Sequence, residues 1–358
     1  MPYIPPTSHV TLLATLKRER LLPMPGEVLA KMNQRVEVST VVAHALVADE
    51  HRLVDVARQL GVRNDKAETF MVKHENDEVK KGEPLAIRKT ALGLATTRVP
   101  SPVDGLLVLS GDGKALLAAI SKPFELRAGL PGTIVDLVPD RGVVIELTGA
   151  LLEGVWGNER DDFAVLRVLG GPEDKLLPEQ VEAGLRGVVL AVGLLEDAAV
   201  FKQITEVRLR GLIIGSLPVE LIPEVQKLAI PVLVTSGFGL QGFSSAAHTL
   251  LVGNNGREVW INAQAWNRYT GKRPEVIIPL PSPGQSPPPP VDGQALQAGV
   301  HVQIVRGPKA GRLGEVRSLS ERAVLIPSGL RTPVASVQLE QSSEPEVVVP
   351  FANLEIIE

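Results

Sequence analysis

Residues 185–262 carry the pattern that most restricts the fold, an alternation of short apolar runs with segments of helical spacing. The runs lie at 188–192, 212–214 and 231–234, and each is continuous, as expected for strands covered on both faces of a parallel sheet. The segments between them repeat apolar residues every three to four positions, which predicts helices. We therefore expect a small, open, mostly parallel sheet, built by right-handed crossovers, in an α/β domain at 179–278.

Strand signals dominate the regions on both sides of this α/β domain. Runs of Val, Leu and Ile separated by glycine-containing turns recur through 8–178, which predicts a β-rich platform. The proline-rich segment 279–292 favours polyproline II, so we expect a semi-rigid linker, with a ligand for a proline-recognising domain as the alternative. Strand patterns return in 293–358. The sequence therefore predicts a multidomain α+β protein of four parts: platform, α/β domain, linker and C-terminal β unit.

Composition restricts the chemistry that the chain can perform. Without cysteine, the chain forms no disulfide, no disulfide-linked complex and no thiolate metal site. The six histidines show none of the spacings typical of metal sites, so we predict no metal and no cofactor. A net charge of −4 gives no overall basic field. No apolar run is long enough to cross a bilayer and no secretory signal is recognised, so we expect a cytoplasmic protein without membrane insertion.

One stretch of the α/β domain matches a phosphate-binding pattern. Residues 237–242 read G-x-G-x-x-G after an apolar run and before a predicted helix, where backbone N–H groups can cradle a phosphate. The match follows the third strand rather than the first, and Asn262 ends the next strand where a dinucleotide site needs an acidic residue. A tight turn without a ligand is therefore the alternative. None of the residues at this edge can act as a general base, so we predict no catalytic residue and leave enzyme activity open. The phosphate-binding candidates are Gly215, Ser216, Ser236, Gly237, Gly239 and Gly242.

An internal repeat connects two parts of the platform. The residues Asn33, Val36, Val42 and Ala43 recur 43 positions later as Asn76, Val79, Leu85 and Ala86. Residues 79–86, followed by 99–107, resemble the biotinyl/lipoyl type of barrel-sandwich hybrid, and the resemblance extends over about residues 20–120. It implies a barrel-sandwich-like platform. Carriers of this type present one lysine on a tight hairpin, and the nearest candidate is Lys89. Because Lys89 follows Leu85 too closely, we prefer a solvated lysine at the end of a strand.

A second local pattern lies in the C-terminal unit. Residues 299–316 combine an alternating strand, a Gly-Pro turn, a glycine at a tight turn and a second strand. They resemble the KOW motif of NusG-type elongation factors and ribosomal proteins, which implies a small SH3-like β-barrel that contacts RNA, ribosome or polymerase. Residues 298–335 contain six basic residues and two acidic ones, whereas residues 336–358 contain five acidic residues and no Lys or Arg. The residues expected to contact the partner are Arg306, Lys309, Gly311, Arg312 and Arg317.

These patterns lead to one functional hypothesis and two alternatives. We expect a non-catalytic multidomain adaptor whose KOW-like module binds RNA, a ribonucleoprotein or another protein, the arginines and the lysine neutralising phosphates. One alternative is an α/β protein that binds a phosphate or nucleotide at the glycine-rich edge. The other is a purely structural scaffold. Both resemblances are local, and neither extends over the whole chain.

Overall fold

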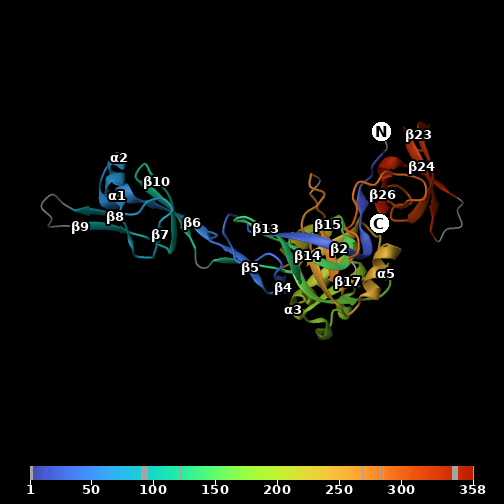
Figure 1. The fold of residues 1–358 in the computed structure, drawn as a ribbon, viewed down its shortest axis with the longest axis horizontal. Coiled ribbons are helices and arrows are strands. Elements are labelled where there is room, and N and C mark those ends of the chain that lie inside the picture. The colour runs from blue at the N-terminus through green and yellow to red at the C-terminus, as the bar shows by residue number, and fades with distance from the viewer. Residues whose placement is uncertain are drawn as a thin grey trace.

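Several β-sheets form the bulk of the protein, and its helices are few and short. A computed structural model describes residues 3–89, 96–120, 123–267, 269–282, 284, 286–340 and 346–357. The molecule is elongated, with residues 46–123 at one end, the C-terminal residues at the other, and a large sheet between them (Figure 1). A β-rich, multidomain α+β protein was expected from the sequence, and this coarse prediction is confirmed.

An eleven-stranded mixed sheet lies at the centre of the molecule. Four of its strands are parallel neighbours in chain order, and the other pairs in the sheet are antiparallel. In spatial order the strands are β15 (Trp156–Gly157), β19 (Val232–Phe238), β18 (Gly211–Leu217), β17 (Val188–Leu194), β16 (Asp161–Val168), β20 (Glu258–Asn262), β21 (Glu275–Pro279), β14 (Gly142–Glu153), β13 (Gly132–Val138) and β4 (Arg35–Val36), with β2 (Val10–Leu21) paired to β14.

The α/β part of this sheet follows the sequence pattern. Strands β17 and β18 are buried along their whole length, which explains their continuous apolar runs. The helices α3 (Val200–Val207) and α4 (Ile222–Lys227) share one buried cluster, and α5 (Ser245–Gly253) contributes to another, with α5 on the opposite face of the sheet. The predicted strands and helices of this region are confirmed. Short 3-10 turns complete it: η2 (Pro178–Gln180), η3 (Ala183–Leu185) and η4 (Val219–Leu221).

Two expectations about this region differ from the structure. The sheet is neither small nor mostly parallel, because β20 and β21 run antiparallel and β14 of the expected platform pairs with β21. The expected domain boundary at residue 178 falls inside the sheet, since β16 precedes it and pairs with β17, which follows it. Each interior strand needs a neighbour on both sides to satisfy its backbone groups, and here those neighbours come from across the boundary.

The repeat predicted from the sequence is also a repeat in structure. Asn33 and Asn76 both adopt positive φ, 61° and 71°. Each precedes a two-residue strand, β4 in the first copy and β7 (Glu78–Val79) in the second. An asparagine tolerates this left-handed conformation better than most residues, which explains its presence in both copies.

The partners of these short strands repeat as well. Val36 of β4 pairs with Gly132, and Val79 of β7 pairs with Gly105. A Cβ added at either glycine would overlap a backbone carbonyl of the following strand, so close backbone approach requires glycine at both positions. The two copies therefore share a turn, a short strand and its partner strand. Whether the shared architecture is a barrel-sandwich hybrid stays a prediction.

The second copy is inserted into the first. Ala45 at the end of β5 (Val41–Ala45) pairs directly with Phe124 at the start of β12 (Phe124–Arg127), and residues 46–123 form the inserted unit between them. This unit has a hydrophobic core of its own, separate from that of the outer copy. The outer copy contributes β3 (Glu27–Val28), β5 (Val41–Ala45) and β12 (Phe124–Arg127). The inserted unit contains β6 (Glu50–Asp55), α1 (Val56–Leu60), α2 (Asn64–Ala67), η1 (Glu68–Phe70), β7, β8 (Pro84–Lys89), β9 (Thr96–Pro100), β10 (Gly105–Gly111) and β11 (Lys114–Ala119).

Lys89, the carrier-lysine candidate, ends β8 and is exposed. It pairs with Thr96 across the β8–β9 hairpin. Residues 90–95, which connect the two strands, lie outside the described residues. The structure is consistent with a lysine at a strand end, and its modification stays an untested hypothesis.

The C-terminal unit, defined as residues 293–357 together with residues 3–8, includes the N-terminus of the chain. Strand β1 (Thr7–Ser8) pairs in parallel with β26, and the ring of Tyr3 lies 5.3 Å from that of Phe351, centroid to centroid. The domain predicted at 293–358 did not include this strand, which comes from the N-terminal end of the chain. The remaining elements are β22 (His301–Ile304), β23 (Leu313–Leu325), β24 (Arg331–Leu339), β25 (Val347–Pro350), η5 (Phe351–Asn353) and β26 (Leu354–Ile357).

The proline-rich segment does not act as a free spacer. The hydroxyl of Thr15 donates to the carbonyl of Pro287 (2.6 Å), and the backbone N–H of Thr15 donates to that of Pro288 (3.3 Å). At the end of the segment, Nε2 of His9 lies 2.9 Å from Oδ1 of Asp292. The segment is thus held on β2 of the central sheet, because β2 presents a free hydroxyl and amide along that edge.

Candidate nucleic-acid interface

The turn between β22 and β23 carries most of the predicted contact residues. Its base is closed by two hydrogen bonds, from the Gly311 amide to the Ile304 carbonyl (2.6 Å) and from the Ile304 amide to the Arg312 carbonyl (3.0 Å). Gly311 has φ 82°, a conformation that favours glycine. Arg306 and Arg312 are exposed, and neither side chain bonds to a residue that the structure describes. Lys309 on the same turn is partly exposed.

This turn packs against the glycine-rich loop of the α/β region. A Cβ added at Gly311 would lie 0.8 Å from Nε2 of Gln241, so the glutamine side chain occupies the space beside the glycine. Gln241 belongs to the G-x-G-x-x-G stretch. The structure therefore brings the two sets of predicted site residues together, which the sequence did not indicate. The contact fixes how the basic turn is presented by the rest of the molecule.

The hydroxyls of the glycine-rich edge bond within the loop. Ser216, which is buried, donates from Oγ to the Gly239 carbonyl (2.9 Å) and accepts from the Gln241 amide (2.9 Å). Ser236 donates from Oγ to the Gly242 carbonyl (2.8 Å). These bonds occupy the two serine hydroxyls and the Gln241 amide, which a bound phosphate would need as hydrogen-bond donors.

The glycines of the same edge are explained by backbone geometry. Gly237 and Gly239 adopt φ 116° and 134°, which side chains rarely reach. A Cβ at Gly242 would lie 1.8 Å from the Pro172 carbonyl oxygen, and one at Gly215 would meet the backbone of the loop at 2.4 Å. The geometry therefore favours the tight-turn alternative, and the phosphate-binding hypothesis gains no support from it.

Arg317, the last predicted contact residue, is placed differently from the turn. It lies on β23, and its Nη1 donates to Oε1 of Glu315 (2.8 Å). Two further exposed arginines lie beyond it, Arg322 on β23 and Arg331 on β24, and neither side chain bonds to a described residue. Both belong to the six basic residues of 298–335, and neither was among the predicted contact residues. The turn signal at Pro327 marks them as the flanks of a hairpin tip.

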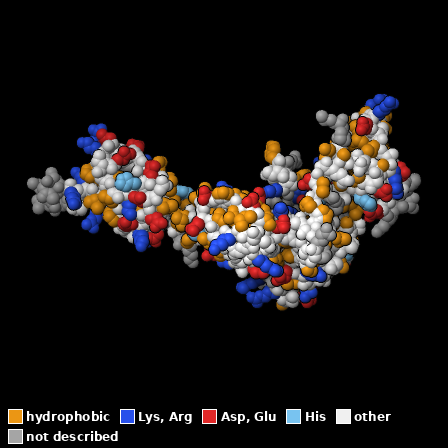
Figure 2. Space-filling model, in the orientation of Figure 1, with side chains coloured by type: hydrophobic (Ala, Val, Ile, Leu, Met, Phe, Trp, Pro, Cys, Tyr) orange, Lys and Arg blue, Asp and Glu red, His pale blue; other side chains and the backbone are white. Residues whose placement is uncertain are grey.

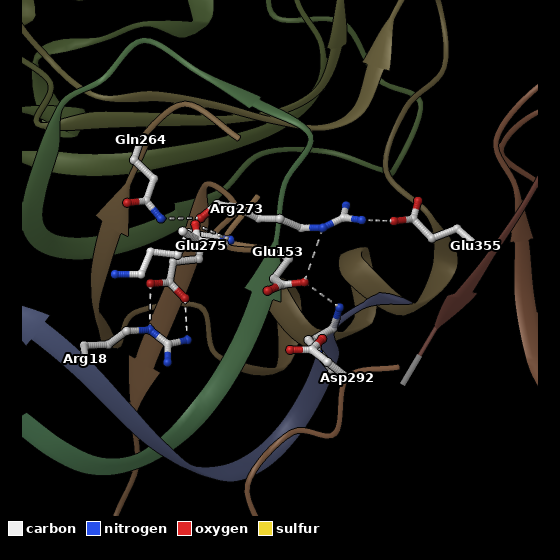
Figure 3. Close-up of polar contacts among 10 residues, drawn as sticks. Arg18, Glu153, Gln264, Arg273, Glu275, Asp292 and Glu355 are labelled. Carbon is white, nitrogen blue, oxygen red and sulfur yellow. Dashed lines mark hydrogen bonds and ion pairs between the residues drawn. The ribbon is translucent and has the colours of Figure 1, made fainter. Parts of the chain in front are cut away.

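A buried polar junction connects the C-terminal unit to the central sheet (Figure 3). Arg273, 5% exposed, precedes β21 and donates from Nη2 to Oε1 of Glu355 on β26. Its Nε lies 3.9 Å from Oε2 of Glu153, and its guanidinium carbon lies 4.5 Å from the ring centroid of Trp266. One arginine thus links two sheets.

Burial changes the acid–base behaviour of this junction. Removal from water raises the pKa of Glu355, and the neighbouring Arg273 opposes that rise. Burial also raises the pKa of Glu153, opposed by His9, whose amide donates to Oε2 of Glu153 (3.1 Å), and by Arg273. Both carboxyls therefore hold a proton more readily than exposed ones.

A groove of about 1070 Å³ lies beneath the proline-rich segment, next to this junction. Its charged lining pairs internally: Arg18 with Glu275 through Nε (2.7 Å) and Nη2, as Figure 3 shows, and Lys272 with Glu19 (2.6 Å). Further pairs join Lys17 to Glu146 (3.4 Å) and Arg20 to Asp161 (3.0 Å). Because its charges neutralise one another, the groove is better explained as part of an internal interface than as a ligand site.

Comparisons give no family to guide the assignment: no protein-family model matches this sequence, and no curated protein matches it either. Within the described part of the chain, no group of three or more His, Asp or Glu side chains could hold a metal ion. None of the described helices is long and apolar enough to span a membrane. Among the described residues, the exposed basic surface of the C-terminal unit is the feature that most directly indicates a function.

Proposed function

We propose that this protein is a non-catalytic cytoplasmic adaptor whose C-terminal unit binds RNA or a ribonucleoprotein partner. The observation that carries the proposal is the turn between β22 and β23. Arg306 and Arg312 project from it without partners among the described residues, while Gly311 rests on Gln241. Free cations on a fixed turn keep their charge for a partner and lose little conformational freedom of the backbone on binding.

The charge distribution supports the same proposal. The basic excess within 298–335 faces outward, since Arg306, Arg312, Arg322 and Arg331 are all exposed. Glu355, one of the five acidic residues that follow, is turned inward and paired with Arg273. The acidic end of the chain therefore offsets the basic surface less than its sequence indicates.

Binding of the full chain to single-stranded and duplex RNA across a salt series tests this proposal. We expect affinity to fall with rising salt, and Arg306→Ala with Arg312→Ala to reduce the slope by about 0.7–0.9 for each arginine that contacts a phosphate. The matched control is Arg58→Ala with Lys66→Ala, two exposed cations of the inserted unit, which should leave the slope unchanged. Absence of binding at low salt, or binding that the first pair of substitutions does not weaken, would refute the proposal.

A face of the inserted unit favours an additional protein partner. Leu53 on β6 pairs with Leu116 on β11, and Leu116 pairs with Leu109 on β10, so three leucines form one row across the sheet. Leu53 and Leu109 are more than half exposed. An apolar row of this kind on an exposed sheet face is typical of protein contact. We assign it to the second arm of the adaptor.

A further inference from the structure

Strands β23 and β24 continue beyond the sheet of the C-terminal unit as a two-stranded ribbon. On one side, β22 pairs with β23 only as far as Glu315. On the other, β25 pairs with β24 only from Val334 onward. Residues 321–333 therefore have only each other as strand partners in the described pairing. Lys and Arg side chains, in blue, lie at the free end of this ribbon at the upper right of Figure 2.

A bulge in the ribbon contains one of its exposed arginines. Ser320 pairs with Val334 and Val324 pairs with Thr332, so three residues of β23 lie opposite Pro333 alone. Proline has no N–H to offer the ladder, which explains why pairing is interrupted here. Bulges of this kind re-aim side chains, and Arg322 is the middle residue of this one. Arg322 therefore has no paired residue on β24 in the described register.

The tip of the ribbon is apolar. Leu325 and Leu330 are 63% and 65% exposed. The turn between them is closed by hydrogen bonds from the Ile326 amide to the Leu330 carbonyl and from the Gly329 amide to the Ile326 carbonyl, both 2.9 Å. Leu325 pairs with Arg331, so a cation lies beside the leucines. The ribbon therefore ends in two exposed leucines, with Arg322 on one strand and Arg331 on the other.

We infer that this ribbon binds double-helical RNA, with Arg322 and Arg331 on the phosphates and the leucine tip against the base pairs of the groove. The inference rests on the proposed function and specifies the form of its ligand. The wide, shallow minor groove of an RNA helix admits protein elements and is flanked by two rows of phosphates. Cations on both strands of a ribbon complement two such rows. Apolar side chains inserted at base steps are a known way of bending duplexes.

The composition of the C-terminal unit argues against a single strand as the ligand. Single-strand binders stack bases on exposed aromatic rings. Phe351 is the only aromatic residue between 293 and 358, and it is buried against Tyr3. The ribbon itself, residues 321–333, contains no aromatic residue and offers arginines and leucines, which suit phosphate rows and grooves rather than splayed bases.

Binding of the full chain to an RNA duplex of about 20 base pairs, compared with one of its strands alone, tests this inference. We expect the duplex to bind about tenfold more tightly. Arg322→Ala and Arg331→Ala should each lower the salt slope on the duplex by about one. Leu325→Ser with Leu330→Ser should weaken duplex binding about tenfold without changing the salt slope, and should abolish bending measured by energy transfer between the duplex ends. The matched control, Leu12→Ser with Val219→Ser at other exposed sites, should have no effect.

Other outcomes separate this inference from the proposed function. If the chain binds both RNA forms equally and only the Arg306 and Arg312 substitutions matter, the ribbon has no part in binding and the inference fails alone. If no RNA binds, both fail. Leucine-dependent binding to anionic lipid vesicles, or to the matching DNA duplex in preference to RNA, would also overturn the assignment.

Discussion

At the scale of single residues, Glu355 shows how burial turns a carboxyl into a pH-dependent contributor to stability. Its pKa is raised by burial, so the folded protein binds this proton more readily than the unfolded chain does. The contribution of Glu355 to the free energy of unfolding is therefore fully present below its ordinary pKa. It is lost as the pH rises through the raised value. Lowering the pH from 7 toward the ordinary value should strengthen this contribution.

The substitution Glu355→Gln tests that sign. The free energy of unfolding of the wild-type protein, minus that of the variant, should increase as the pH falls from 7 to 5, by at most about 1.4 kcal/mol per pH unit. Denaturant unfolding at several pH values measures it. Glu220→Gln at an exposed position is the control and should show no such trend. A difference that shrinks on acidification would mean that pairing with Arg273 outweighs the burial of the carboxyl.

Local sequence patterns predicted the backbone geometry of the candidate site but not its contacts. The spacing around Gly311 correctly predicted a tight turn, because that requirement is local, and Gly311 has positive φ there. The contact between Gly311 and Gln241 is not local, and no sequence signal marks it. Ser216 was a phosphate-binding candidate because it follows a predicted strand, yet its hydroxyl bonds within the loop. A short motif specifies residue types but not the partners that their polar atoms find.

At the scale of elements, the strands with continuous apolar runs were predictable and their partners were not. β17 and β18 lie where the sequence placed strands, because burial on both faces leaves a strong pattern. The pairing of β14 with β21 joins residues far apart in the chain, and apolar runs carry no information about such partners. The same limit applies to the expected boundary at 178, across which β16 pairs with β17, and to the proline-rich segment, which bonds to Thr15 of β2.

Strand β1 provides a prediction at this scale. Deleting residues 1–8 removes β1, the packing of Tyr3 on Phe351 and the bond from the Leu296 amide to the Tyr3 carbonyl (2.9 Å). We expect the C-terminal unit to lose roughly 2–4 kcal/mol of stability, from one aromatic pair and a few backbone hydrogen bonds. Hydrogen exchange at the amides of β22 and β26 in the full-length background measures the loss.

Point variants refine this test. Tyr3→Ala should reproduce about 1 kcal/mol of the loss, as expected for an aromatic pair. Tyr269→Ala is its matched control, because Tyr269 is fully exposed and no ring contact is recorded for it among the described residues. Unchanged exchange protection after the deletion would show that residues 293–357 fold without the N-terminal strand.

At the scale of the whole molecule, the nested repeat separates the inserted unit, residues 46–123, which we call the arm, from the rest of the protein, the body. The inserted unit has its own core, and the chain leaves and re-enters the outer copy at two residues, Ala45 and Phe124, that pair directly. Directly paired antiparallel residues lie about 5 Å apart, a distance that a two-residue turn spans. We therefore expect the basic C-terminal unit and the apolar-faced inserted unit to fold without depending on one another.

Replacing residues 46–123 with Asn-Gly tests this separation. The shortened protein should keep its cooperative unfolding and its RNA affinity within about twofold, because the inserted unit and the C-terminal unit lie at opposite ends of the molecule (Figure 1). Its radius of gyration in solution scattering should decrease, as removal of one end of an elongated molecule requires. The excised segment expressed alone should fold, since its buried cluster is complete without the body. Loss of RNA binding by the shortened protein, measured beside an unchanged circular dichroism spectrum, would instead mean that the arm takes part in the RNA contact, and the division of the adaptor into two ends would have to be abandoned.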